Sequence, residues 1–210
     1  MRYLITAGPT REPIDKVRYL SNRSSGQMGI AIANAAVEAG HHVTLLTGPG
    51  VSGAPSNECQ RHLFETTADL QALLQSHWPN HDALVMAAAV SDYTIEKLSK
   101  EKIARLDDGT LTLNLTPTPD LVALTAKNRQ PHQRVIAFAL EHYENLIERA
   151  TEKLERKAVD AIVANPLQTI DAPHINATWI QSNGQTDSPG DMLKQTFANW
   201  LIEKIETLFP

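Results

Sequence analysis

The sequence has few of the residues that crosslink chains, bind nucleic acid or span membranes. Its single cysteine, Cys59, cannot form an internal disulfide, which suits a reducing cytoplasm. Its 24 acidic residues outnumber 19 basic ones, so non-specific nucleic-acid binding is not expected. No run in the sequence approaches the roughly 20 apolar residues of a membrane-spanning helix, and the apolar start is too short for a signal peptide. We expect a cytoplasmic protein that binds neither nucleic acid nor membranes.

Several common catalytic motifs are also absent from the sequence. It contains no G-x-x-x-x-G-K-[ST] phosphate loop, no G-x-S-x-G nucleophile elbow and no H-E-x-x-H or Cys/His metal spacing. His62 follows Cys59 by three positions, but nothing nearby indicates an activated thiolate. These absences argue against a P-loop NTPase and a nucleophile-elbow hydrolase, and the sequence identifies no metal ligands.

Apolar segments alternate with helical segments along most of the chain. The expected buried strands are 3–7, 42–47, 83–88, 134–140 and 161–164, with a half-exposed strand at 111–115 and a last one at 177–181. The expected helices are 26–42, 67–78, 120–128, 143–158 and 191–208. In the fourth helix, Ile147, Ala150, Leu154 and Ala158 share the predicted buried face.

This alternation predicts an α/β fold: a Rossmann-like, mainly parallel sheet with helices on both faces. We expect one domain over residues 1–210, with a lid-like insertion at 96–118. In such a sheet, ligands bind at the carboxyl ends of the strands. The loops after the apolar segments are therefore the places to look for chemistry.

The loop after the first strand opens a helix, a setting in which backbone N–H groups bind phosphate. Ser24 and Ser25 offer hydroxyls there, and Gly26 and Gly29 leave room for close backbone approach. The spacing is not G-x-G-x-x-G, and the alternative is a loop whose glycines serve helix–sheet packing. The pattern slightly favours an anion site. For Asn22 a turn is the favoured interpretation, although its amide could both donate to and accept from a ligand.

Asp92 follows the third buried strand, after three alanines. The alanines leave a flat surface for a planar group, and Asp92 could accept hydrogen bonds from a ribose or a base. An aspartate that begins a turn explains this position equally well.

Two groups of cations stand out in an acidic chain. The first lies in the expected lid and comprises Lys97, Lys100, Lys102 and Arg105. Acidic neighbours favour a solvated face, but a basic lid over phosphates could stabilise developing charge. The second is the pair Lys153 and Lys157, which share one helical face. Because glutamates are interleaved with this pair, the pattern alone favours an ion-paired surface helix.

The segment ITAGPTREPIDKVRYLSNRSSGQMGIAIANAA closely resembles the opening of phosphopantothenoylcysteine synthetase, the second half of the bifunctional coenzyme A biosynthesis flavoprotein. The resemblance continues, in family order, through VMAAAVSDY, EKIAR, TPTPDL, VIAFALE, KLERK and DAIVANPL, from residue 5 to about residue 167. The SNRSSGQMG block is highly specific, whereas the later pieces are weak alone.

The resemblance implies a ligase that works in two steps. The carboxylate of 4'-phosphopantothenate attacks the α-phosphate of CTP, or of ATP, which releases pyrophosphate and gives an acyl-nucleotide (an acyl-cytidylate with CTP). The amine of cysteine then attacks the acyl carbon and releases the nucleoside monophosphate. Mg²⁺ would neutralise the triphosphate, and no flavin is expected. The resemblance also suggests a homodimer, and a decarboxylase encoded as a separate polypeptide because the chain begins at the synthetase segment.

The resemblance also assigns roles to individual residues. Asn22 matches the family asparagine that holds the acyl-nucleotide for attack by cysteine, and Lys102 matches the lid lysine associated with forming it. Positions that match nucleotide contacts are Ala88, Asp92, Thr118, Pro119, Asp120, Phe138, Lys153 and Lys157. This reverses the surface-helix interpretation of the lysine pair. The substrate-phosphate loop would comprise Ser24, Ser25, Gly26 and Gly29.

The sequence departs from the family pattern in two places. The lid motif, commonly Lys-x-Lys-Lys, has Ala104 and Arg105 at its last two positions, and the common Phe-Ala-Ala-Glu run has Leu140 at its third. Arg105 keeps the charge with a different geometry. Both changes concern nucleotide preference and rate more than the reaction. The alternatives are a non-catalytic nucleotide-binding relative, supported by the altered lid, and a dinucleotide-dependent oxidoreductase, which lacks its phosphate fingerprint.

Overall fold

A central sheet of eight strands runs through the protein in the order β13-β12-β10-β9-β6-β1-β4-β5. The computed structural model describes residues 1–51, 53, 55–105, 109–170 and 172–210. The sheet strands are β1 (Arg2–Ala7), β4 (His42–Thr47), β5 (Gln60–Leu63), β6 (Ala83–Met86), β9 (Arg134–Glu141), β10 (Ala161–Pro166), β12 (Thr178–Gln181) and β13 (Thr186–Asp187). The strands from β5 to β10 are parallel, β12 pairs antiparallel with β10, and β13 pairs antiparallel with β12. The predicted mainly parallel sheet is confirmed.

The chain reverses its direction of winding at β1. It lays down β4 and β5 on one side of β1, then crosses to β6, β9 and β10 on the other. This is the 3-2-1-4-5-6 order of a doubly wound Rossmann sheet, in which ligands bind where the strand order reverses, outside the carboxyl ends of the strands. The topology therefore predicts a ligand site outside the carboxyl ends of β1 and β6.

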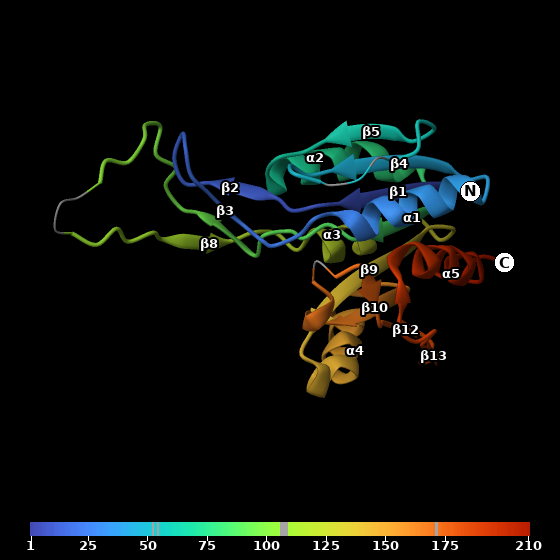
Figure 1. Ribbon diagram of the computed structural model, residues 1–210. Helices are drawn as coiled ribbons and strands as arrows, with labels where there is room; N and C mark the ends of the chain where they lie inside the picture. The colour runs from blue at the N-terminus through green and yellow to red at the C-terminus, as the bar shows by residue number, and fades with distance from the viewer. Residues whose placement is uncertain (52, 54, 106–108, 171) are drawn as a thin grey trace.

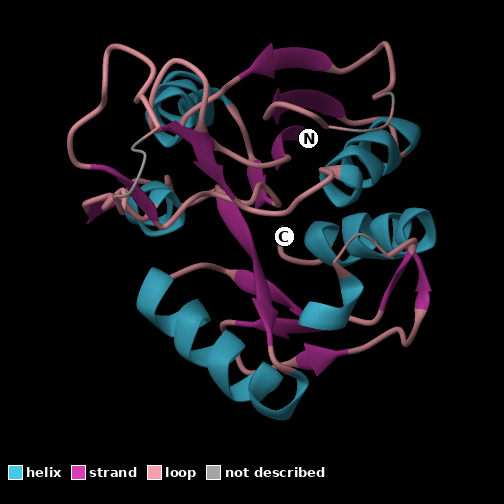
Figure 2. Cartoon of the chain, turned by 60° about the vertical axis from the view of Figure 1, so that its left-hand side comes forward, coloured by secondary structure: helices cyan, strands magenta, loops and turns pink. Residues whose placement is uncertain are grey.

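Helices cover both faces of the sheet, as predicted (Figure 2). They are α1 (Gln27–Glu38), α2 (Thr67–His77), α3 (Leu121–Lys127), α4 (Leu146–Lys157) and α5 (Lys194–Glu206), with single 3-10 turns η1 (Trp78–Asn80), η2 (Tyr143–Asn145) and η3 (Leu167–Thr169). On one face α1 and α5 pack on the sheet, with Ile32 and Phe197 in one buried cluster. On the other face α2, α3 and α4 contribute Leu70, Leu121 and Leu154 to a second cluster.

Local sequence explains where the helices begin and end. Thr66 and Asp69 form a capping box that starts α2. The helix predicted to reach residue 42 ends instead at Glu38, because Gly40 takes a left-handed φ of 81° and the chain turns into β4. In α4 the predicted buried face is wrong at Ile147, which is 44% exposed, and at Ala158, which is exposed and caps the end of the helix. Leu146 is buried in place of Ile147, together with Ala150 and Leu154.

Short two-stranded ribbons lie outside the central sheet, and the strands at 11–13, 19–21 and 115–117 extend away from it in Figure 1. They pair β2 (Arg11–Pro13) with β3 (Tyr19–Ser21), β7 (Tyr93–Ile95) with β8 (Leu115–Pro117), and β11 (His174–Ile175) with β14 (Met192–Leu193). We call residues 93–117 the arm. It contains most of the expected 96–118 insertion, of which residues 106–108 lie outside the described part.

The strand expected at 111–115 is wrong apart from its last residue. Only Leu115 enters a strand, β8, and the alternating leucines Leu111 and Leu113 are exposed. An alternating pattern predicts a strand only where one face is buried, and these leucines cover no core of their own chain. Among the described residues, no helix has the length and apolar character needed to cross a membrane.

Candidate active site

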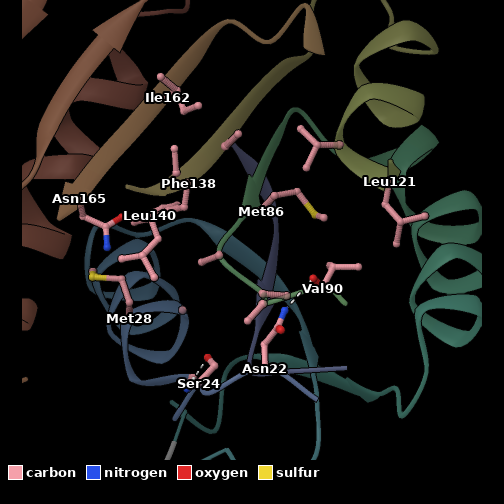
Figure 3. A pocket seen from close by; sticks show the side chains of 18 of the residues that line it. Asn22, Ser24, Met28, Met86, Val90, Leu121, Phe138, Leu140, Ile162 and Asn165 are labelled. Atoms are coloured by element: carbon pink, nitrogen blue, oxygen red, sulfur yellow. Dashed lines mark hydrogen bonds between the residues drawn. The ribbon is translucent and has the colours of Figure 1, made fainter. Parts of the chain in front are cut away.

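A cavity of about 770 Å³ lies at the carboxyl ends of β6, β9 and β10, beside the start of α1. Its walls are the loop 22–29, the loop 86–92, the start of α3 at 118–122, the end of β9 at 137–140 and one side of α4. Figure 3 shows Leu140 and Asn165 on the side of the cavity opposite Leu121, with Asn22 between the two walls. The cavity lies at the strand ends, where ligand binding was predicted, and its volume suits a nucleotide-sized ligand.

Asn22 is held by a hydrogen bond to another segment. Its Nδ2 donates to the Val90 carbonyl oxygen at 2.9 Å, which ties the loop before α1 to the loop after β6 (Figure 3). Ser21, just before it, donates its hydroxyl to the Thr10 carbonyl at 2.7 Å. Asn22 is exposed to the cavity, and the side-chain oxygen and second N–H of its amide offer an acceptor and a donor to a ligand. Asn22 is therefore more than a turn former.

The glycines of this loop have two different structural roles. Gly26 precedes α1 with a left-handed φ of 72°, which favours glycine. At Gly29, an added Cβ would lie 2.5 Å from the Ala7 Cβ and 2.8 Å from the Thr6 carbonyl oxygen. Gly29 thus lets α1 approach β1 closely, so the packing interpretation holds for this residue. Both glycines, with Ser24 and Ser25, also line the cavity.

Two buried threonines fix the loop after β6. The Thr6 hydroxyl accepts from the Ala88 N–H at 3.0 Å, and the Thr10 hydroxyl accepts from the Ser91 N–H at 2.9 Å. Both threonines are fully buried, so these bonds hold Ala88 and its neighbours in place at the cavity wall. The sequence analysis missed both threonines, although a polar residue inside the first apolar strand was a signal for Thr6.

Thr118, Pro119 and Asp120 line the opposite side of the cavity. The Thr118 N–H donates to the Asp92 carbonyl oxygen at 2.9 Å, and Asp120 caps α3 by accepting from the Ala123 N–H at 3.1 Å. The two segments around Asp92 and Thr118, both expected to contact the nucleotide, thus lie against one another although they are 26 positions apart in the sequence. Phe138 and Leu140, from the end of β9, also line the cavity.

The lysine pair on α4 faces the cavity, and each lysine has a carboxylate partner. Lys157 Nζ donates to both oxygens of Asp120, at 2.8 and 2.7 Å, and Lys153 pairs with Glu141. Burial alone would raise the pKa of Asp120, but the hydrogen bond from Lys157 and the capping N–H lower it below its usual value. The expectation of a surface helix is therefore replaced by a pair that lines the cavity.

The cavity collects positive charge in an acidic chain. Its basic lining residues are Arg23, Lys153, Arg156, Lys157 and Lys194, against two acidic ones, Asp92 and Asp120. Of the five basic residues, only Lys153 and Lys157 were predicted to lie at the site. Side chains contributed by separate loops and by the start of α5 have no common spacing in the sequence, so no motif could reveal them.

Lys102 and Arg105 are not among the residues that line the cavity of their own chain. Both are exposed on the arm. Ile103, which lies between them, is bound to the β2–β3 turn. There the Ile103 N–H donates to Asp15 at 3.1 Å and Arg18 donates to the Ile103 carbonyl at 3.1 Å. The two predicted lid cations are therefore separated from the other predicted site residues within one chain.

The described residues include no group of three or more His, Cys, Asp or Glu side chains that could hold a metal ion. Two acidic residues line the cavity, and since Asp120 is paired with Lys157, Asp92 is the one that offers a carboxylate to a metal ion. Oxygen ligands of this kind suit Mg²⁺, which is commonly bound by one or two carboxylates together with substrate phosphates. The residues therefore fit a magnesium ion that arrives with a polyphosphate.

Comparison with known proteins gives relatives about twice as long as this chain. It is 40% identical over 167 residues to a Cysteine/Cysteine sulfinic acid decarboxylase from an unknown prokaryotic organism, covering 80% of this chain and 46% of that protein. It is 33% identical over 211 residues to the Coenzyme A biosynthesis bifunctional protein CoaBC of Vibrio vulnificus (strain CMCP6), covering 98% of this chain and 52% of that protein. The chain spans about half the length of the curated relatives it matches.

The fold is that of a known domain. The crystal structure of the C-terminal domain of Coenzyme A biosynthesis bifunctional protein CoaBC superimposes with a TM-score of 0.84 and 32% sequence identity, covering 99% of this chain and 94% of that chain. Residues 1–208 match the family described as DNA/pantothenate metabolism flavoprotein C-terminal domain. The chain therefore belongs to the family of DNA/pantothenate metabolism flavoprotein C-terminal domains.

Proposed function

We propose that this protein is a cytoplasmic phosphopantothenate–cysteine ligase of coenzyme A biosynthesis. Its family and its 32% identity to the C-terminal domain of CoaBC support the pathway. The observation that carries the proposal is the cavity itself. It brings Asn22 together with five basic side chains at the strand ends of a Rossmann-like sheet, where an acidic protein has concentrated cations suited to a polyphosphate.

In the first step, the cavity would hold a nucleoside triphosphate beside the carboxylate of 4'-phosphopantothenate. Lys153, Arg156 and Lys157 bind the phosphates and offset the charge that develops as the carboxylate oxygen attacks the α-phosphorus. The bond from the α-phosphorus to the bridging oxygen breaks, and pyrophosphate leaves with that oxygen. The acyl-nucleotide remains bound.

In the second step, the amine of cysteine attacks the acyl carbon of the intermediate. Asn22, fixed by its bond to Val90, holds the intermediate through its remaining N–H and its carbonyl oxygen. The carbon–oxygen bond to the nucleotide breaks, the nucleoside monophosphate leaves, and the amine proton is lost to solvent. A residue held by the backbone of another loop is suited to this role because its amide is oriented before the substrate arrives.

Bound with the triphosphate, Mg²⁺ would withdraw charge from the phosphate oxygens and so favour attack at phosphorus. Asp92 is the residue on this chain that would hold it, because both oxygens of Asp120 already accept from Lys157.

We propose CTP as the nucleotide. Phe138 and Leu140 lie together on the wall formed by the end of β9. Leucine at position 140 occupies more room than the alanine commonly found in the corresponding run, and the smaller pyrimidine base is favoured in a narrower space.

We further propose a homodimer in which the arm of one chain supplies Lys102 to the cavity of the other. Lys102 lies outside the cavity of its own chain, and exposed apolar side chains accompany it on the arm: Tyr93, Leu98, Leu111, Leu113 and Leu115. Exposed apolar side chains gathered on one projecting segment are typical of a protein–protein contact. A decarboxylase would then act on the amide product, which carries the carboxylate of cysteine.

The test is an assay with purified protein, 4'-phosphopantothenate, cysteine, Mg²⁺ and either CTP or ATP. We expect pyrophosphate release that requires phosphopantothenate, and an amide product that also requires cysteine. CTP should support faster turnover than ATP. Absence of pyrophosphate release with both nucleotides would contradict the ligase and favour a non-catalytic nucleotide-binding protein.

A further inference from the structure

Each lysine of the pair at the cavity wall is bound to a carboxylate of its own chain. Both oxygens of Asp120 accept from Lys157, and Glu141 pairs with Lys153. The side chains of Lys157 and Glu141 are only 18% and 16% exposed. Shielding from water strengthens such ion pairs relative to pairs on an open surface.

Both carboxylates are attached to fixed backbone. Asp120 is the N-cap of α3 and also accepts from the Ala123 N–H. Glu141 is the last residue of β9 and pairs with Pro166 of β10 in the sheet register. Their positions are set by secondary structure, so the two negative charges remain beside the lysines after a ligand enters.

An incoming phosphate must therefore compete with the protein's own anions. A small anion that binds one lysine replaces an existing ion pair and meets the repulsion of the displaced carboxylate. A nucleoside triphosphate extends further and gains contacts to other basic residues of the same cavity, such as Arg23, Arg156 and Lys194. Repulsion by the two carboxylates therefore weakens the binding of small anions more than the binding of a nucleoside triphosphate.

We propose that Glu141 and Asp120 are specificity-determining residues that exclude inorganic phosphate and pyrophosphate from the cavity while a nucleoside triphosphate is admitted. The proposal rests on the proposed function in that it assumes a nucleotide polyphosphate in this cavity. The two carboxylates would then have a second effect in the reaction. Because they weaken the binding of pyrophosphate, they favour its departure after the first step.

The test compares Glu141→Gln and Asp120→Asn with the wild-type protein. Glutamine keeps the shape of Glu141 without its charge, and asparagine keeps the helix cap of Asp120. We expect titration calorimetry with pyrophosphate to give a Kd about tenfold lower in each variant than in wild type, because a repulsive charge has been removed. The Kd for inorganic phosphate should also be lower in each variant, but by a smaller factor.

Glu152→Gln is the matched control. Glu152 lies on the same helix and pairs with Arg149 at 3.4 Å, but both side chains are about 60% exposed, and such pairs contribute little. The control should leave the Kd for pyrophosphate unchanged. Thermal unfolding of each variant checks that the fold is intact.

Unchanged or weaker pyrophosphate binding in both folded variants would overturn the proposal. A purely structural role would lower the melting temperature without tightening the binding of an anion. The binding measurement needs no turnover, so it is independent of the ligase assay. If wild type forms no amide but the variants bind pyrophosphate more tightly, the proposed function fails and the role of the carboxylates stands.

Discussion

Asn22 illustrates how a single residue gains a role from a contact that the sequence does not reveal. Its position in a polar run favoured a turn, yet its amide donates to Val90, 68 positions away. That bond leaves the residue exposed to the cavity with a fixed orientation. Lys102 shows the opposite outcome, since the family resemblance assigned it to the site and the chain's own cavity does not include it.

Substitution of these two residues should affect different steps. In Asn22→Ala we expect the acyl-nucleotide to accumulate, because the amide that holds it for cysteine is lost. In Lys102→Ala we expect its formation to be suppressed, because a cation is lost from the first step. Each change should slow amide formation at least about tenfold. Rapid-quench detection of the acyl-nucleotide distinguishes them, and wild-type turnover in both variants would refute the assigned roles.

At the scale of elements, the arm depends on the turn between β2 and β3. The Asp15 side chain is fully buried and accepts from the N–H groups of Val17 and Arg18, at 2.8 Å each, and from the Ile103 N–H at 3.1 Å. One carboxylate therefore closes the turn and fixes the segment just after Lys102. Burial alone would raise the pKa of Asp15, but these N–H groups and the guanidinium of Arg18 lower it overall.

Asp15→Ala should release the arm while the central sheet stays intact. Three backbone N–H groups that close the turn and join it to the arm lose their acceptor in this variant. Hydrogen exchange should accelerate in residues 99–105 and not in β1 or β6. Because the pKa of Asp15 lies below its usual 3.8, wild-type protein should keep the slow exchange at pH 5 and lose it only at pH values below 3.8.

Lys16→Ala provides the control for this element. Lys16 also joins the turn to the arm, through Glu101 at 2.8 Å, but the two side chains are 61% and 80% exposed. An exposed pair of this kind contributes little. Equal acceleration of exchange in Lys16→Ala and Asp15→Ala would show that the arm is held by its surface charges and not by Asp15.

At the scale of the whole molecule, overall charge and local charge have opposite signs. The chain has a formal net charge of −5, yet basic residues outnumber acidic ones five to two around the cavity. The fold achieves this by bringing together α4, the loop before α1 and the start of α5. Composition gives only the overall charge, and the family resemblance led us to expect local cations at Lys102, Arg105, Lys153 and Lys157.

The proposed homodimer gives a test that involves the whole assembly. If each arm serves the partner's cavity, a heterodimer of Asn22→Ala and Lys102→Ala chains contains one site with both residues intact. After dissociation and random reassociation of equal amounts, about half of the dimers are mixed and about a quarter of all sites are intact. We expect the mixture to have about a quarter of the wild-type turnover. Light scattering measures the mass of the assembly and so checks that dimers have re-formed. No recovery in mixed dimers would mean that each arm serves its own chain.

Although it did not reveal β5 or β13, the sequence by itself determined the five helices, most strands of the central sheet and their mainly parallel arrangement. These follow from apolar runs, helix caps and glycines, which act within a few residues. The short ribbons were not predictable, because a two- or three-residue strand has too little pattern to distinguish it from a loop. The alternation at 111–115 was misleading because its leucines cover no core of their own chain.

Tertiary structure decided which side chains meet. Topology brings Asn22 to Val90 and Asp120 to Lys157, and it separates Lys102 from the cavity of its own chain. Local sequence cannot encode such contacts, because they depend on how loops from distant strands converge at one edge of the sheet. Helical spacing alone favoured an ion-paired surface for the lysine pair, whereas the family resemblance predicted that it meets the nucleotide. Its pairing with Asp120 and Glu141 depends on the packing of α4 against the sheet.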